Sequence, residues 1–433
     1  MNKSKKYIYV GFGFGAIQAG LFLYEAFRSG SFDRLVVAEV VPDVVKAVRD
    51  NKGYFSVNIA HKDGIEQCKI GPIEIYNPAF DEDRKKLVEA VAEAHEIGTA
   101  VPSVKNYVSE GKGSIQCILA EGLRRKIRND LGRAVIYCAE NHNHAAEILE
   151  EKVITEIPEQ ERESIRSGVQ FLDTVIGKMS GVISDCGEIE SQKLATITPQ
   201  IQRAFLVEEF NRILISRIKF DKDDFVRGIT VFEEKDDLMP FCEAKLYGHN
   251  ATHALAGYIG ALLGTQHIAD LKQIEGMLPF LRAAFIEESG TTLIKRHLGK
   301  DALFTPAGYE AYADDLLERM TNPYLRDSIE RVTRETERKL GWDDRLIGTI
   351  RLAFKHGVEP KRYAFGAAAA LAFLNRSMID DQSLIENLLK DIWKESSPDA
   401  KEAEKVFCLV KEAMTNLKKW KDSHFPNLDN FLT

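Results

Sequence analysis

The chain has 433 residues, 44% hydrophobic and 29% charged, which is enough for two or three globular domains with sizeable cores. It carries 58 Lys and Arg against 66 Asp and Glu, and the net charge of −8 argues against a general binder of nucleic acid or anionic membranes. The longest apolar run, residues 367–373, is far too short to span a bilayer, and the basic amino terminus leads into glycines instead of the apolar core of a signal peptide. We therefore expect a cytoplasmic protein without nucleic-acid or membrane partners.

Two groups of residues are candidates for metal ligands, and both lack suitable spacing. The six cysteines are scattered without a C-x-x-C pair, so we expect reduced thiols and neither disulfides nor a zinc centre. His142 and His144 form an H-x-H, but no carboxylate or third histidine stands at the usual ligand spacing from them. We predict no metal.

A glycine-rich loop near the amino terminus predicts a dinucleotide site. Residues 7–10 are a short apolar run typical of a strand, G-F-G-F-G-A follows, and a helical pattern comes next. Strand, glycine turn and helix are the context in which G-x-G-x-x-G/A binds a dinucleotide. We expect Gly11 to allow the tight turn, Gly13 to let the pyrophosphate approach the backbone, and Ala16 to fill the small third position. Gly15 belongs to the same predicted site.

The end of the second strand predicts which dinucleotide is bound. This strand covers residues 34–38 and ends at Glu39. A carboxylate about twenty residues beyond the loop suits the ribose 2′-hydroxyl of NAD and repels the 2′-phosphate of NADP. The sequence therefore predicts NAD as the cofactor, and the alternative is a glycine turn with no ligand.

The rest of the amino-terminal half alternates between strand and helix patterns. We expect strands at residues 97–102, 134–138, 171–176 and 205–215 and in the stretch 53–78, the later runs extending one sheet, with helices at residues 42–50, 83–95, 115–129 and 143–151. Because the carboxyl ends of such strands face the ligand crevice, Thr99, Ala100 and Val101 should lie along the cofactor. The same argument makes Asn141, just beyond the next strand, a candidate amide donor facing the reaction centre.

From about Asp236 onward the strand signals fade and helical patterns follow one another. These cover residues 238–263, 268–298, 309–320, 328–340, 344–356, 364–373 and 401–420, and the first is capped by Asp236 or Asp237. The predicted fold is a Rossmann-type α/β dinucleotide-binding domain with extra strands over residues 1–235, followed by an all-α domain over residues 236–433.

The stretch KLYGHNATH at residues 245–253 places three different polar groups on one helix. On an α-helix Asn250 lies about 140° and His253 about 80° around the axis from Lys245, so the three share one broad face. The amine can act as a base if burial lowers its pKa, the amide can donate to an oxyanion, and the imidazole can orient or shuttle a proton. The alternative is a solvated helix face with an incidental lysine.

A second polar cluster predicts an anion site. Arg331, Arg334 and Arg338 are spaced i, i+3 and i+7 on the predicted helix 328–340, and Lys339 follows them. Such a cluster suits the phosphate or carboxylate of a small substrate. The alternative is ion pairing with acids of the same helix. These acids are Glu330, Glu335 and Glu337.

In combination these features resemble the polyol-specific long-chain dehydrogenases, the mannitol dehydrogenase family. The resemblance is best over residues 245–356, where the matching stretches are K-x-x-x-x-N-x-x-H, Glu288-Ser289-Gly290, Leu293-Ile294-Lys295-Arg296, Asn322-Pro323-Tyr324-Leu325 and Asp344-Arg345-Leu346-Ile347. The glycine loop, Glu39, Thr99-Ala100-Val101 and Cys138-Ala139-Glu140-Asn141 also stand where the family has counterparts.

The resemblance implies a metal-independent, NAD-dependent alcohol dehydrogenase in which Lys245 is the general base. It further implies that Asn141 and Asn250 are the paired amides around the substrate oxygen and that His253 is the active-site histidine. The cofactor would come from one domain and the base from the other, around a polyol or polyol phosphate. We expect a monomer or a weak homo-oligomer.

One departure from the family leaves the substrate open. The family often has V-D-R and then a proline where this chain has Ile176-Gly177-Lys178, and the carboxyl-terminal tail is longer than in compact members. We expect a hexitol phosphate, with mannitol 1-phosphate and fructose 6-phosphate as the interconverted pair, and an unphosphorylated polyol or a sugar acid as the alternative. A non-catalytic NAD-binding sensor and a zinc alcohol dehydrogenase also remain as alternatives.

Overall fold

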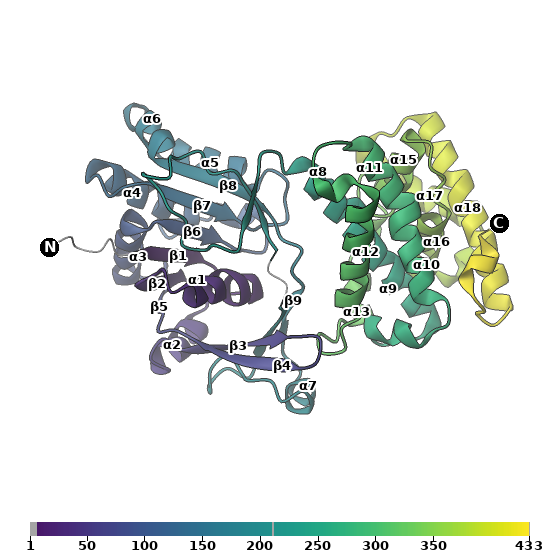
Figure 1. The fold of residues 1–433 in the computed structure, drawn as a ribbon, viewed down its shortest axis with the longest axis horizontal. Coiled ribbons are helices and arrows are strands. Elements are labelled where there is room, and N and C mark those ends of the chain that lie inside the picture. The colour runs from purple at the N-terminus through teal and green to yellow at the C-terminus, as the bar shows by residue number, and fades with distance from the viewer. Residues whose placement is uncertain (1–6, 210–211, 433) are drawn as a thin grey trace. The chain divides into compact units, whose positions relative to one another are not determined.

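The computed structural model describes residues 7–209 and 212–432, which form two compact units (Figure 1). The first unit is Met1–Met239 and the second is Pro240–Thr433. The division therefore falls a few residues beyond the predicted boundary after residue 235, where the last strand, β12 (Glu233–Lys235), ends. The α/β class of the first unit and the helical class of the second are confirmed.

An eight-stranded sheet forms the centre of the first unit. Its strands, in spatial order, are β12, β11 (Leu214–Ser216), β8 (Val169–Val175), β7 (Ala134–Cys138), β6 (Glu96–Thr99), β1 (Ile8–Phe12), β2 (Arg34–Ala38) and β5 (Glu74–Tyr76). Neighbouring strands from β8 to β5 are parallel, whereas β11 runs antiparallel to β8. The chain order reverses between β1 and β6, and this switch point is where open parallel sheets bind their ligands.

The two faces of this sheet are covered by different layers. One core packs the sheet against helices α3 (Asp81–Glu93), α4 (Ile115–Arg128), α5 (Ala145–Thr155) and α6 (Glu159–Gly168), through residues such as Leu87, Leu119 and Leu149. The other core holds α2 (Pro42–Asp50) and the helical residues 16–29, which contain the π-helix η1 (Gln18–Leu23) and α1 (Tyr24–Ser29). Strands buried on both faces explain why β1 and β7 read as unbroken apolar runs.

A second, four-stranded sheet corrects the prediction for residues 205–215. That run was expected to extend one sheet, but its first part is β10 (Ala204–Glu208), which pairs in parallel with β3 (Phe55–Ala60). The other strands of the sheet are β4 (Ile65–Ile70) and β9 (Ser180–Ile183). Only β11 joins the main sheet, and residues 210–211 lie outside the described part of the chain. Both parts have strand-forming residues, so their different partners are set by tertiary packing.

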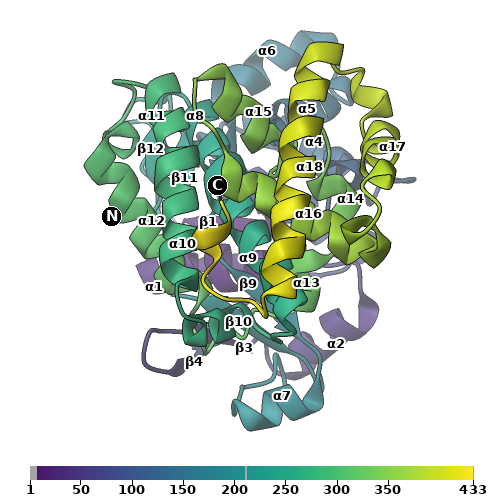
Figure 2. The same ribbon diagram turned by 90° about the vertical axis from the view of Figure 1, so that its right-hand side faces the viewer.

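The second unit is built from helices. In chain order they include α8 (Met239–Glu243), the π-helix η3 (Ala244–Asn250), α9 (Ala251–Leu263), η4 (Ile268–Gln273), α10 (Met277–Ala283), the π-helix η5 (Ala284–Gly290), α11 (Thr291–Arg296), α12 (Pro306–Met320), α13 (Ile329–Thr333), α14 (Thr336–Lys339), α15 (Ile347–Lys355), α16 (Lys361–Leu374), α17 (Ser383–Ile392) and α18 (Ala400–Asp422). Helix α16 packs between α9 and α18, and Figure 2 shows α16 beside α18. The side chain of Asp237 accepts a hydrogen bond from Met239 N at 3.0 Å, as expected of a cap.

Two of the predicted long helices are wrong. The prediction for residues 268–298 is interrupted before α10, where Gly276 has a left-handed φ of 75°. The prediction for residues 328–340 breaks into α13 and α14 at Glu335, a non-glycine residue with φ of 53°. Helices α6, α17 and α7 (Cys186–Ser191) were not predicted.

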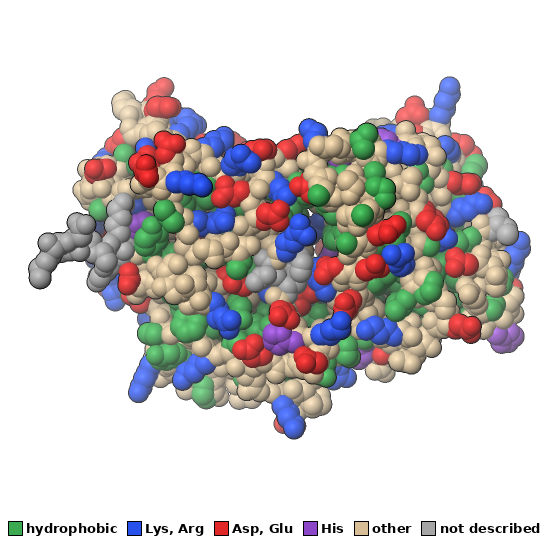
Figure 3. All heavy atoms as spheres, in the orientation of Figure 1, with side chains coloured by type: hydrophobic (Ala, Val, Ile, Leu, Met, Phe, Trp, Pro, Cys, Tyr) green, Lys and Arg blue, Asp and Glu red, His purple; other side chains and the backbone are tan. Residues whose placement is uncertain are grey.

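Two tryptophan side chains anchor the core of the second unit. Trp393 and Trp420 are almost fully buried, and the ring of Trp393 lies 4.8 Å from that of Trp342, centroid to centroid. On the face drawn in Figure 3, acidic and basic side chains are interspersed among hydrophobic ones. Within residues 7–209 and 212–432, no helix is long and apolar enough to cross a membrane.

Candidate active site

A cavity of about 810 Å³ opens at the carboxyl ends of β1, β2, β6 and β7 in the first unit. Phe12, Ala38, Ala100 and Ala139 line it, one from the end of each of these four strands. Gly13, Gly15, Ala16, Glu39 and Val101 also line it, so most of the predicted cofactor residues lie around one space. The volume falls within the range of pockets that hold small molecules and cofactors.

The tight turn lies at Gly13, and the role predicted for Gly11 needs correction. Gly13 has φ of 88°, and a Cβ there would stand 2.7 Å from the carbonyl oxygen of Ala100. Gly11 instead lies within β1, where a Cβ would stand 2.1 Å from Nε2 of Gln18. That amide donates to the hydroxyl of Tyr9 at 2.7 Å. Gly11 therefore makes room for helix packing on the strand, and Gly13 makes the turn.

The loop and the following helix suit a pyrophosphate. Helical residues begin at Ala16, and the first backbone N–H groups of a helix have no partner within the helix and carry a partial positive charge. Gly15 is exposed, and a Cβ at this position would meet nothing within 4 Å beyond its neighbours along the chain. Because the N–H of Gly13 donates to the carbonyl oxygen of Ala38 at 2.9 Å, the groups suited to an anion are the N–H groups at the start of the helix, beside the uncrowded Gly15.

Glu39 lies at the end of β2, on the wall of the same cavity. The residue is 9% exposed, and Oε1 accepts a hydrogen bond from the backbone N–H of Val41 at 2.8 Å. This bond orients the carboxylate at the position where a ribose 2′-hydroxyl is recognised in this class of fold. The glycine turn, the helix start and this acid together fit NAD.

Thr99 does not line the cavity, and its hydroxyl points to a buried acid that the sequence did not single out. Glu140 accepts hydrogen bonds from Thr99 Oγ1 and from the backbone N–H of Val101, both at 2.9 Å, and from the hydroxyl of Tyr107. Burial raises the pKa of Glu140, although these hydrogen bonds oppose the shift. Glu140 thus ties the end of β7 to the loop that follows β6.

Asn141 directly follows Glu140 and is exposed, in a bend between β7 and α5. It does not line the cavity, so its predicted role as an amide donor stays a prediction.

His142 and His144 are also exposed, with ring centroids 6.2 Å apart. Among the described residues, no group of three potential ligands is placed to hold a metal ion.

In the second unit, Lys245 and Asn250 lie on a π-helix where an α-helix was predicted. The segment η3 (Ala244–Asn250) has backbone bonds of the i to i+5 type, which is the spacing of these two residues. They therefore stand one turn apart on the same side, closer around the axis than the 140° of an α-helix. Both are half-buried, and π-helical turns are frequent at functional sites.

The surroundings of Lys245 favour an uncharged amine. Burial lowers the pKa of Lys245, and the positive charge of Arg345 lowers it further, while Cys242 opposes the shift. His249, on the same π-helix, is buried with a pKa well below its usual value because of burial and the charges of Arg319, His253, Lys245 and Arg345. We call these basic side chains, Lys245, His249, His253, Arg319 and Arg345, the cation-rich group.

His253 is held by a buried carboxylate. Its Nε2 lies 2.6 Å from Oδ2 of Asp327, and Oδ1 of Asp327 accepts from Nε of Arg331 at 2.8 Å. Burial alone would raise the pKa of Asp327, but the charges and hydrogen bonds of His253 and Arg331 lower it to about 2. An ionised carboxylate can only accept, so Nε2 of His253 carries a hydrogen. The sequence did not reveal this pair because Asp327 lies 74 residues away.

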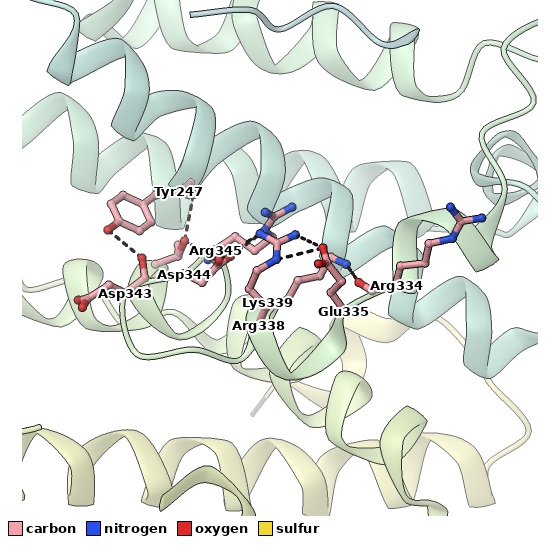
Figure 4. A network of polar contacts seen from close by, with 9 residues as sticks. Tyr247, Arg334, Glu335, Arg338, Lys339, Asp343, Asp344 and Arg345 are labelled. Atoms are coloured by element: carbon pink, nitrogen blue, oxygen red, sulfur yellow. Dashed lines mark hydrogen bonds and ion pairs between the residues drawn. The ribbon is translucent and has the colours of Figure 1, made fainter. Parts of the chain in front are cut away.

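The basic residues predicted to share one helix face are separated by the helix break (Figure 4). Arg331 pairs with Asp327, and Arg334 is exposed and 4.0 Å from Glu330. Arg338 pairs with Glu335 at 2.8 Å and with Asp344 at 3.4 Å. The amine of Lys339 donates to the carbonyl oxygen of Arg334. Ion pairing within this stretch, the alternative to an anion site, is confirmed for Glu330 and Glu335.

Lys339 and Arg345 belong to the cation-rich group. Burial and the charges of Arg345 and Arg338 lower the pKa of Lys339 to about 8. Arg345 is largely buried, and its Nε donates to Asp344 at 2.8 Å. Figure 4 shows Arg338, Asp344 and Arg345 in one network, in which Asp344 pairs with both arginines. Arg345 stands in a stretch that matched the family, but only the structure shows its proximity to Lys245.

Known families match both units. Residues 8–225 match the mannitol dehydrogenase Rossmann domain and residues 237–421 the mannitol dehydrogenase C-terminal domain. The chain is 30% identical to mannitol-1-phosphate 5-dehydrogenase of Bacillus licheniformis, over 84% of this chain and 86% of that protein. It is 27% identical to the enzyme of the same name from Caldanaerobacter subterraneus, over 84% and 85%.

Solved structures share the fold at low sequence identity. Mannitol 2-dehydrogenase of Pseudomonas fluorescens, in a ternary complex with NAD and D-mannitol, has a TM-score of 0.69 at 14% identity and covers 99% of this chain and 94% of its own. A D-sorbitol dehydrogenase has a TM-score of 0.70 at 13% identity, with 99% and 92% covered. Given the two domain matches and the relative at 30% identity, the chain belongs to the mannitol dehydrogenase family of NAD-dependent polyol dehydrogenases.

Proposed function

We propose that this protein interconverts a hexitol phosphate and a ketose phosphate, with mannitol 1-phosphate and NAD giving fructose 6-phosphate and NADH. The observation that carries the proposal is the half-buried Lys245, whose pKa is lowered by burial and by Arg345, one π-helical turn from Asn250. A neutral amine beside an amide donor is the equipment needed to take a proton from an alcohol and to bind the resulting oxyanion.

In the oxidation direction, neutral Lys245 accepts the proton of the reacting hydroxyl. The amides of Asn250 and Asn141 donate to the oxygen as negative charge develops on it. His253, oriented by Asp327, donates or accepts through its Nδ1 at the substrate. Bound NAD supplies the hydride acceptor. In the reduction direction, protonated Lys245 returns the proton to the carbonyl oxygen.

The cation-rich group supports a phosphorylated substrate. Lys339 is buried and Arg345 is largely buried, close to other cations, and an anion would relieve the repulsion that, after burial itself, lowers the pKa of Lys339. Arg338 lies on the same group, whereas Arg331 is held by Asp327 and serves His253 in this proposal. The two relatives named mannitol-1-phosphate 5-dehydrogenase point to the same substrate class.

A substrate panel tests the proposal. NADH formation would be followed with mannitol 1-phosphate, mannitol and glucitol 6-phosphate, and NADH consumption with fructose 6-phosphate and fructose. We expect kcat/KM for the phosphorylated member of each pair to be at least about a hundredfold higher, because a hydrogen bond to a charged group contributes about 1.5–3 kcal/mol and two such bonds correspond to about a hundredfold or more. Activity on free polyols alone would contradict the phosphate assignment while leaving the dehydrogenase chemistry intact. Exhaustive chelation is expected to leave the rate unchanged.

The same group of cations also suits the carboxylate of a sugar acid, which is the second candidate. Including an aldonate and a uronate in the panel distinguishes the two. Turnover of the acids with no turnover of phosphates would favour the second candidate. Arg345→Gln should lower kcat/KM for either anionic substrate far more than for a neutral polyol of the same length.

A further inference from the structure

Arg203 is a charged residue on the wall of the cofactor cavity that neither the motifs nor the family resemblance singled out. It immediately precedes β10 in the second sheet. Its backbone is fixed by a short hairpin, in which Arg203 O accepts from Ile197 N at 2.8 Å and Thr198 bridges Ile201. The side chain is exposed, so a fixed backbone carries a guanidinium that faces open space.

The contacts of its neighbour indicate which part of the cavity Arg203 faces. Phe205, two residues on, also lines the cavity, as residues at i and i+2 of an extended chain do when they share a face. The ring of Phe205 packs edge-on against Phe14 with 5.5 Å between centroids. Phe14 directly follows the turn glycine, Gly13. The second sheet therefore packs directly on the glycine turn, and Arg203 lies on the cavity side of that contact.

The charges that line the cavity leave Arg203 available for a bound anion. Among the described residues that line the cavity, Glu39 and Arg203 are the charged ones. Glu39 is committed to the backbone of Val41 and to the predicted ribose contact. Arg203 forms no ion pair within residues 7–209 and 212–432. A bound dinucleotide brings two phosphate charges to the glycine turn, where the protein otherwise offers neutral backbone N–H groups.

We propose that Arg203 forms an ion pair with the pyrophosphate of NAD, so that the glycine turn and the second sheet hold the phosphates from two sides. A guanidinium suits this role because it can donate two parallel hydrogen bonds to phosphate oxygens. The second sheet is then part of the cofactor site, not only a cover for the core.

Calorimetric titration of the full chain with NADH, ADP-ribose, adenosine and NADPH tests the proposal. ADP-ribose retains the pyrophosphate without the nicotinamide, and adenosine lacks both phosphates. We expect Arg203→Ala to raise the Kd of NADH and of ADP-ribose about tenfold or more, and to leave the Kd of adenosine within about twofold. Arg203→Lys should fall between, and the wild-type Kd for ADP-ribose should rise with salt more steeply than that of Arg203→Ala.

Arg217→Ala is the matched control. Arg217 is an exposed arginine of the same unit that pairs with Asp236 and does not line the cavity, so its removal should change none of the four Kd values. An unchanged Kd for ADP-ribose in Arg203→Ala would overturn the proposal. Equal weakening of adenosine and ADP-ribose would also overturn it, by showing a general change of the cavity. Weakening confined to NADPH would assign Arg203 to a 2′-phosphate instead.

Discussion

Lys245 combines three properties that together suit a proton acceptor: partial burial, a nearby Arg345 and an amide one π-helical turn away. Each property favours the neutral amine or the oxyanion that results from its action. His253 and Asp327 form a separate pair in which the carboxylate stays ionised and fixes the ring. At the scale of single residues, nearby charges in the second unit therefore set the protonation of Lys245 and the orientation of His253.

Replacing Lys245 tests its role directly. Lys245→Ala should leave NADH affinity nearly unchanged and lower kcat by about 10²–10⁴-fold, the usual contribution of a positioned base. Stopped-flow or steady-state turnover, with NADH titration by fluorescence, measures both. Lys272→Ala, at an exposed lysine of the same unit, is the control and should behave as wild type. A Lys245→Ala variant with near-wild-type turnover across pH would rule out the base.

The pH dependence follows from the direction of the Lys245 shift. Oxidation requires the neutral amine, so kcat/KM for the polyol should rise with pH and level off above the pKa of Lys245. Reduction requires the protonated amine, so its kcat/KM should fall over the same interval. Because the pKa is lowered from 10.5, the midpoint should lie below that value in both directions. Initial rates from pH 6 to 11 give the profile, and a midpoint at or above 10.5 would contradict it.

Cofactor preference should depend on the charge of Glu39. Glu39→Gln keeps an oxygen that can accept from Val41 N but removes the charge that repels a 2′-phosphate. We expect the ratio of kcat/KM for NAD over NADP to fall by about tenfold, which corresponds to the loss of one charge repulsion of about 1.4 kcal/mol. Kinetics with both cofactors measure the ratio. A ratio unchanged in Glu39→Gln would place the selectivity elsewhere.

At the scale of elements, two buried carboxylates hold the ends of helices and loops that carry site residues. Glu140 joins the end of β7 to the loop after β6. Glu288, in the π-helix η5, accepts from the backbone N–H groups of Arg362 and Tyr363 at 2.8 and 3.1 Å, and so caps α16 from a distant part of the chain. Tyr363 in turn bonds to Thr252, between Asn250 and His253. Capping of α16 is thus linked to the placement of the site helix.

Glu288 should make stability depend on pH. Burial raises its pKa from 4.5 to about 7, so the native state binds this proton more tightly than the unfolded chain does. Its contribution is fully present below about pH 4.5 and is lost as pH rises through about 7, by an amount on the order of 3 kcal/mol. The difference in thermal midpoint, wild type minus Glu288→Gln, should therefore decrease as the pH rises from 5 to 8. A constant difference across that interval would contradict the shift.

The local features of the chain were predictable, and the features that depend on distant partners were not. Gly13 and Glu39 could be placed because strand, turn and following strand lie within one short stretch. The break at Glu335 could not, since the apolar spacing of residues 328–340 is compatible with a continuous helix. The π-helix at Lys245 could not be predicted for the same reason, because its sequence pattern is compatible with an α-helix. Asp327, Glu140 and Arg345 take their roles from tertiary contacts alone.

At the scale of the whole molecule, the candidate cofactor site and the candidate catalytic side chains belong to different units. The first unit contains the cavity predicted to hold the cofactor, with the switch point of its sheet, the glycine turn and Glu39 around one space. The second contains the amine, the amide, the oriented histidine and the cations proposed for the substrate. Each has its own core, so a substitution such as Arg203→Ala and one such as Lys245→Ala should affect binding and turnover separately.

All three tryptophans of the sequence, Trp342, Trp393 and Trp420, belong to the helical unit. Intrinsic emission excited near 295 nm therefore reports on that unit alone, while NADH bound in the other unit absorbs where indoles emit. Quenching of the indole signal on NADH addition would measure how closely the two units approach in solution. The effect of a polyol phosphate on that quenching would show whether substrate changes their separation. The three tryptophans thus provide an intrinsic fluorescence probe that needs no attached dye.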